Sequence, residues 1–169
     1  AYSRRPDYPK ALALIDGLIA ERPNDGYFYE AKGQMVLESG KSAEALTLYQ
    51  RAVELLPNEP LIRIDLARIQ VDQESPETYR AAIANLQFAQ RFEPDNGEIW
   101  RLLSIAYGRD NQIGMATLAM AERALLQRNR GEARGLAERA ERLLPSGSAA
   151  QLRAQDIRQA AERLKKEQQ

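Results

Sequence analysis

Residues 26–57 read GYFYEAKGQMVLESGKSAEALTLYQRAVELLP, and this stretch decides how the rest of the chain is interpreted. It contains two amphipathic segments, and Gly40 between them is typical of a helix C-terminus. Two helices can approach closely only where the side chains that face each other are small. The stretch therefore predicts two packed helices, over about residues 27–38 and 43–56, with Ser42 as N-cap of the second. Small residues stand at the expected points of closest approach, Gly33, Ala45 and Ala52.

The order and spacing of these residues resemble a tetratricopeptide (TPR) repeat, a 34-residue helix–turn–helix unit with the pattern W-x2-L-G-x2-Y…A-x3-F…P. Tyr29 stands for the Trp and Tyr49 for the Phe, while Lys32 and Val36 depart from the Leu and Tyr. The register extends along the chain, because prolines that follow amphipathic stretches are separated by 34, 37 and 51 residues. These prolines are Pro23, Pro57, Pro94 and Pro145.

The resemblance implies one TPR domain over residues 1–169, an all-α, right-handed solenoid of about nine antiparallel helices without strands. An extra helix over about residues 112–127 can pack on both of its neighbours, because successive TPR helices stack antiparallel. Asp7 and Ser75 are further expected N-caps. The expected units are a half repeat over 7–23 whose first helix lies upstream, a full repeat over 26–59, a repeat with a longer turn over 60–94, a repeat and a half over 97–145, and a C-terminal capping helix over 149–167.

Aromatic residues occupy several of the repeat positions. Trp100 and Tyr107 have the spacing of the packed TPR core, so we expect them to be core residues. Tyr27, Phe28 and Tyr29 are consecutive, and one helix cannot bury three consecutive side chains on a single face. If Tyr29 is core, one of the other two is left for the neighbouring helix or for a groove.

Composition excludes several classes of function. There is no histidine and no cysteine, which removes His-based catalysis, thiolate chemistry and the H-E-x-x-H zinc motif from this chain. We expect no metal and no cofactor. Lys+Arg and Asp+Glu both number 24, so there is no global positive charge to favour nucleic acid. No apolar run approaches the roughly 20 residues that span a bilayer, so we expect no membrane insertion.

The candidate binding surface is the concave face that the first helices of TPR units form. Lys and Asn at the positions of Glu30 and Gln34 would give the carboxylate clamp of chaperone-binding TPRs, and they are absent. Arginines farther along this face can hold a peptide carboxylate or an acidic side chain. Counting equivalent positions, the predicted partner-binding residues are Tyr27, Glu30, Gln34, Ile64, Arg68, Arg101 and Arg109.

Five stretches, YFYEAKGQMVLESG, AVELLPNEPLIRIDLA, WRLLSIAYGR, GMATLAMAERALL and LPSGSAAQLRAQDI, resemble a particular family. They are similar to the C-terminal TPR region of bacterial BepA-type zinc metallopeptidases. The resemblance implies a periplasmic protein whose TPR part binds unfolded outer-membrane proteins or their assembly machinery, while an upstream protease domain carries H-E-x-x-H and the zinc. The present chain would be the non-catalytic part, and no catalytic residue of the family falls on it.

Two other interpretations stay open. The chain can be a stand-alone TPR scaffold or a co-chaperone-like adaptor without a protease partner. It can also be a scaffold that assembles through an exposed N-terminal helix, because a TPR unit is covered only by its neighbours.

Overall fold

The computed structural model describes residues 8–166, with side chains to residue 163. Within this range there are nine helices and no strand, which confirms the predicted all-α fold. Asp7, a predicted N-cap, and residue 167, the predicted end of the last helix, lie outside the described residues. The helices are α1 (Tyr8–Glu21), α2 (Gly26–Glu38), α3 (Ser42–Leu55), α4 (Pro60–Val71), α5 (Pro76–Gln90), α6 (Gly97–Arg109), α7 (Ile113–Leu126), α8 (Arg130–Leu143) and α9 (Ala149–Lys166).

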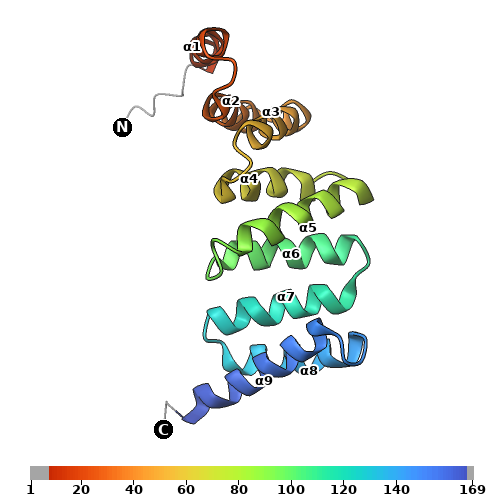
Figure 1. Ribbon diagram of the computed structural model, residues 1–169. Helices are drawn as coiled ribbons and strands as arrows, with labels where there is room; N and C mark the ends of the chain where they lie inside the picture. Colours follow the sequence, from red (N-terminus) through yellow and green to blue (C-terminus); the bar gives the residue numbers. More distant parts are fainter. Residues whose placement is uncertain (1–7, 167–169) are drawn as a thin grey trace, which may run out of the picture.

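The helices stack in chain order into one elongated array, with α1 at one end and α9 at the other (Figure 1). Every helix packs against the next one along the chain, as expected for a solenoid whose repeats contact only their neighbours. Two pairs of next-but-one helices also touch, α4 with α6 and α7 with α9. The first helices of successive units therefore form a layer of their own, and this layer includes α4 and α6.

The pair α2 and α3 shows why this sequence forms a helical hairpin. Asp25 caps α2, because its side chain accepts a hydrogen bond from the backbone N–H of Tyr27 at 3.2 Å. Gly40 follows α2 at φ +85°, a left-handed conformation that favours glycine. A Cβ at Gly33 would lie 2.8 Å from the ring of Tyr49, which is 1% exposed. The two helices thus approach as closely as the small-residue pattern predicts.

The helix predicted as an insertion is α7, and it packs against both α6 and α8. It therefore serves as second helix to α6 and as first helix to α8, as expected. Because α7 also contacts α9, the last three helices form a unit in which α7 and α9 lie in one layer. The inner face of α9 is fully buried, with Ala154, Ile157 and Ala161 at 0% exposure.

The core consists of three clusters that follow one another along the array. The first joins α2, α3 and α4 around Val36, Ala45, Tyr49, Ala52, Ile62, Leu66 and Ile69. The second joins α4 to α7 and includes Leu86, Ile99, Leu103 and Tyr107. The third joins α7, α8 and α9 through Leu118, Ala137, Leu144 and Ile157. The predicted core position of Tyr107 is confirmed, whereas Trp100 is only partly buried beside the second cluster.

The predicted N-cap Ser42 is wrong, whereas Ser75 is the N-cap residue of α5 but makes no capping hydrogen bond. Ser42 is the first residue of α3 rather than its cap, and its Oγ accepts a hydrogen bond from Gln73 at 3.2 Å. Ser75 precedes α5 as expected but caps no backbone N–H, because its hydroxyl donates to the carboxylate of Glu77. In both cases the serine hydroxyl forms a hydrogen bond with a nearby polar side chain and not with the backbone N–H that the sequence pattern predicted.

Candidate protein-binding face

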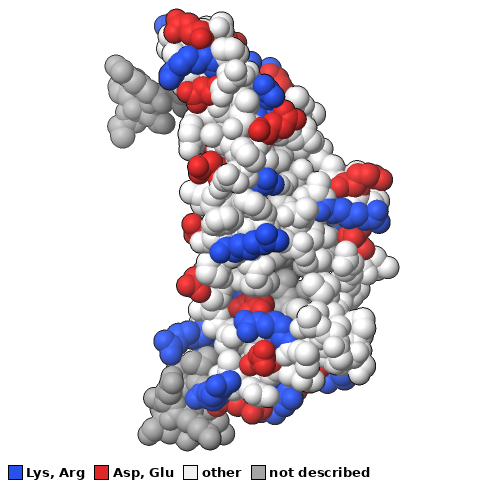
Figure 2. All heavy atoms as spheres, in the orientation of Figure 1, with Lys and Arg blue, Asp and Glu red and all other residues white. Residues whose placement is uncertain are grey.

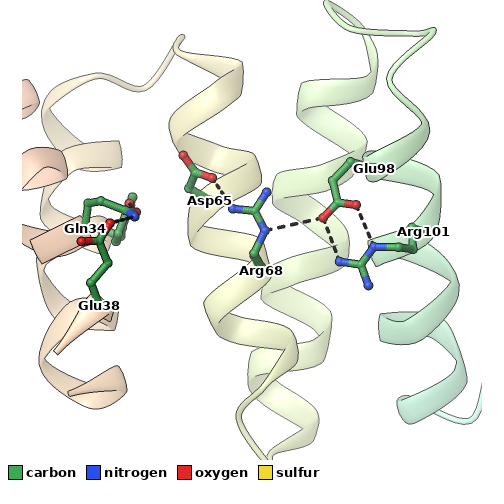
Figure 3. A network of polar contacts seen from close by, with 7 residues as sticks. Gln34, Glu38, Asp65, Arg68, Glu98 and Arg101 are labelled. Atoms are coloured by element: carbon green, nitrogen blue, oxygen red, sulfur yellow. Dashed lines mark hydrogen bonds and ion pairs between the residues drawn. The ribbon is translucent and has the colours of Figure 1, made fainter. Parts of the chain in front are cut away.

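Four of the seven predicted binding residues lie on one continuous face of the first helices. Glu30 and Gln34 come from α2, Arg68 from α4 and Arg101 from α6. Polar contacts along this face involve three further carboxylates. Figure 3 shows six of its side chains following one another across the three helices. We call this surface the polar strip, and define it as Glu30, Gln34, Glu38, Asp65, Arg68, Glu98 and Arg101.

Of the other three predicted residues, Ile64 and Arg109 make contacts away from this face, and Tyr27 stands at its edge, three residues before Glu30. Ile64 is 4% exposed and belongs to the second core cluster, so its prediction as a contact residue is wrong. Arg109 donates to the carbonyl of Val71 and lies 5.8 Å from the ring centroid of Tyr79, which ties it to the neighbouring unit. Tyr27 is 51% exposed at the start of α2. This agrees with the prediction that one member of the aromatic triplet 27–29 is left outside the core of its own helix pair.

The α4 and α6 part of the polar strip is an ion network between two units. Arg101 donates twice to Glu98, at 2.7 and 2.8 Å, and this bidentate contact lowers the pKa of Glu98. Arg68 binds Asp65 of its own helix at 2.6 Å and approaches Glu98 of the next unit at 3.5 Å. Both guanidiniums are therefore engaged already, so an acidic ligand would have to compete with carboxylates of the protein.

The α2 part of the strip is held by a chain of hydrogen bonds. The hydroxyl of Tyr49 on α3 donates a hydrogen bond to the side-chain oxygen of Gln34 on α2 at 3.1 Å. Gln34 donates to Glu38 at 2.6 Å, and Tyr8 of α1 donates to the other oxygen of Glu38 at 2.7 Å. The bond from Gln34, followed by that from Tyr8, lowers the pKa of Glu38. A core tyrosine thus orients the polar side chains above it.

Glu30 differs from the other carboxylates of the strip. Desolvation raises its pKa, and the negative charge of Asp65 on α4 raises it further. No hydrogen bond or ion pair to Glu30 occurs among the described residues. The strip therefore offers one half-buried carboxylate that a cationic group of a partner can neutralise.

Glu38, Asp65, Glu98 and Tyr49 were not predicted as part of this face. The sequence does contain a signal for three of them, because they stand three or four residues from a predicted strip residue. Side chains at these spacings are neighbours on a helix surface. Tyr49 gave no such signal, since its ring is core and only its hydroxyl reaches the surface.

Other kinds of site find little support in the part of the chain that the structure describes. Acidic and basic side chains are intermixed over the face in Figure 2, without one dominant patch. No group of three or more potential ligand residues within residues 8–166 is placed to hold a metal ion. No helix in this range is both long and apolar enough to cross a membrane.

The fold and the spacing of its helices define a TPR-type solenoid, an all-α class built from stacked helical hairpins. The chain is similar in fold to solved structures of MamA, which are TPR-like. For MamA from Desulfovibrio magneticus the TM-score is 0.68 at 19% identity, covering 98% of this chain and 89% of that one. A further MamA structure gives 0.64 at 15% identity, covering 96% and 91%.

In sequence, the chain is similar to the beta-barrel assembly-enhancing protease of Yersinia pestis, with 28% identity over 146 residues. The match covers 86% of this chain but 29% of that protein, so the chain spans less than a third of its relative. The resemblance to a BepA-type TPR region, predicted from five sequence stretches, is thereby confirmed. No protein-family model matches the chain.

Proposed function

We propose that the chain is a protein-interaction module that binds extended protein segments along the polar strip. The observation that carries this proposal is the continuity of the strip across α2, α4 and α6, with Arg68 and Glu98 in contact between units. A surface that repeats from unit to unit suits an extended ligand, because successive residues of the ligand meet successive helices. The proposed site binds without catalysing, and needs no metal or cofactor of its own.

The charges of the strip favour a particular class of segment. Glu30, Glu38, Asp65 and Glu98 outnumber Arg68 and Arg101, and Glu30 has no cationic partner among the described residues. We therefore expect segments with a net positive charge to bind better than acidic ones. This preference differs from the sequence-based expectation, in which the arginines were to hold acidic groups.

Binding to unfolded outer-membrane-protein segments tests the proposal. Titration followed by anisotropy should show saturable binding that weakens about tenfold when Glu30 is replaced by Gln and Asp65 by Asn, since a positively charged segment then loses two carboxylates of the strip. Replacing Glu44 and Glu54 on α3 by Gln removes the same charge outside the strip, so it is the matched control and should leave affinity unchanged. If no binding is measured, or if both double variants bind with equal affinity, the polar strip is not the binding site.

The similarity to the Yersinia pestis protease supports a finer proposal about the whole protein. We infer that this module is the non-catalytic, client-binding or partner-binding part of a periplasmic zinc metallopeptidase that acts in outer-membrane protein quality control. The sequence of the full reading frame tests this directly, because an H-E-x-x-H motif upstream is either present or absent.

A stand-alone scaffold is the second candidate. It is favoured by the MamA structures, of which the chain covers 89% and 91%, since these solved chains are TPR-like arrays of similar size. A reading frame that codes for little beyond these 169 residues would support the scaffold and exclude the protease.

A further inference from the structure

A pocket of about 420 Å³ opens where the two layers of the array meet, away from the residues of the polar strip. Four helices, α5, α6, α7 and α9, supply its walls. The residues that matter for its chemistry are Gln90, Trp100, Tyr107, Met115, Leu118 and Arg153. We call it the layer-junction pocket.

The extra helix explains why a pocket lies at this place. In the first part of the array, α4 is covered by α6, the first helix of the next unit. In the second part, α7 is covered by α9. The next-but-one contacts therefore pass from the layer of α4 and α6 to the layer of α7 and α9, and this change falls between α6 and α7. Trp100 of α6 stands at a position that TPR units pack, yet here it is only partly buried. The change of layer thus leaves this indole accessible from the pocket.

The walls are mainly apolar, and apart from one ion pair the polar groups among them are neutral. Trp100 makes no hydrogen bond within the described residues, and neither does the side-chain amide of Gln90. The hydroxyl of Tyr107 accepts a hydrogen bond from Gln87 at 2.9 Å. An indole N–H donor and an amide that can both donate and accept are therefore available beside Met115 and Leu118.

The two charged residues at the pocket neutralise each other. Glu122 of α7 is 6% exposed, and Arg153 of α9 binds its two oxygens at 2.6 and 2.8 Å. This hydrogen bonding raises the pKa of Arg153. A charged ligand group in the pocket would be desolvated without a free counter-charge, which is unfavourable. The pocket is therefore suited to a neutral group.

We propose that the layer-junction pocket is a second binding site, which takes an uncharged protein segment by inserting one large apolar side chain. The inserted side chain packs on Trp100, Met115 and Leu118, as anchor residues do in protein interfaces. The main-chain carbonyl and N–H beside it pair with Gln90 and the Trp100 indole. The site is independent of the polar strip, so the molecule can hold one partner at two places.

Trp100 is the only tryptophan of the chain, so its fluorescence reports on the pocket directly. The full chain is titrated with capped pentapeptides Gly-Ser-Xaa-Ser-Gly in which Xaa is Phe, Leu, Asp or Lys. The Phe and Leu peptides should shift the emission in a saturable way. The Asp and Lys peptides should bind at least about tenfold more weakly, because burying an unpaired charge is unfavourable.

Three variants complete the test. Ala150→Phe places a ring in the pocket and should abolish the response, whereas Ala84→Phe, on the exposed surface of α5, should not. Gln90→Ala, which removes only the amide, should weaken binding severalfold without affecting folding. Replacing Arg68 and Arg101 should leave the response intact, which separates this site from the polar strip.

Several results would overturn the proposal. These are the absence of a saturable shift with the Phe and Leu peptides, an unchanged shift in Ala150→Phe that circular dichroism shows to be folded, or loss of the shift when Arg68 and Arg101 are replaced. Saturation by toluene but by none of the peptides would show a site for small apolar molecules instead.

Discussion

At the scale of single residues, the close packing of α2 on α3 depends on Gly33 and Tyr49. The ring of Tyr49 fills the space that a Cβ at Gly33 would need, at 2.8 and 2.9 Å from two ring carbons. The same ring carries the hydroxyl that holds Gln34 on the polar strip. Burial, followed by the negative charges of Asp65 and Glu30, raises the pKa of Tyr49, so it stays protonated and donates at physiological pH.

Gly33→Ala should therefore destabilise the protein although alanine favours helices. Overpacking costs about 1–3 kcal/mol, more than the roughly 0.5–1 kcal/mol gained from helix propensity. Gly135→Ala is the matched control, because nothing lies within 4 Å of its Cβ position in α8, and it should stabilise by about 0.5–1 kcal/mol. Urea unfolding measures both changes, and stabilisation by Gly33→Ala would contradict the tight contact.

Glu30 gives a prediction about pH. Its pKa in the folded state is raised, so the folded protein favours the protonated form and loses stability as the pH rises through that folded pKa. Glu30→Gln should stabilise the protein at neutral pH by no more than about 1 kcal/mol, because water still reaches the half-buried side chain and screens its charge.

This gain should vanish when the pH falls below the ordinary pKa of a glutamate, where Glu30 is neutral in both states. Thermal unfolding of the wild type and the variant from acidic to neutral pH measures the difference. A gain that is equal at all pH values would show that desolvation and Asp65 are not its cause.

At the scale of elements, the helix ends are set by local hydrogen bonds that differ from one helix to the next. Ser148 accepts a hydrogen bond from the backbone N–H of Gln151 at 3.2 Å, and the side chain of Gln151 accepts from the N–H of Gly147 at 2.8 Å. These reciprocal bonds resemble a capping box and begin α9 beside the layer-junction pocket.

Ser148→Ala should destabilise the protein by about 1 kcal/mol, as expected for loss of an N-cap. Ser42→Ala should have a smaller effect, because Ser42 accepts only from the side chain of Gln73 and caps no backbone N–H. Chemical denaturation of both variants makes the comparison. If Ser42→Ala loses as much stability as Ser148→Ala or more, Ser42 does stabilise the start of α3.

At the scale of the whole molecule, an ion pair between Glu122 of α7 and Arg153 of α9 links two helices at the end of the array. The side chain of Glu122 is 7% exposed, whereas that of Arg153 is 50% exposed. Removing one partner of such a pair leaves a buried charge without compensation, which is more destabilising than loss of a surface pair.

Arg153→Ala should therefore destabilise by about 2 kcal/mol, less than for a fully buried pair because Arg153 itself is half exposed. Arg134→Ala breaks the exposed pair with Glu138 on α8 and should cost under about 0.5 kcal/mol. Equal losses in the two variants at neutral pH would show that Glu122 is not effectively buried.

The helices, their order and the repeat register could be predicted from the amino-acid sequence alone. These follow from periodicity, from small residues such as Gly33 and Ala45, and from prolines spaced by a repeat, and all of these act over short stretches of chain. For the same reason the exposed Tyr27 and the extra helix α7 could be predicted.

The contacts between side chains of different helices could be known only from the packing of the folded chain. Ile64 faces the core and not the strip, Arg68 reaches Glu98, and Trp100 lines a pocket, because each outcome depends on how helices of different units pack together. Residues about 30 positions apart meet in these contacts, as Glu122 and Arg153 do. A local pattern carries no information on the position and rotation of a helix relative to its neighbours, which fixes such contacts.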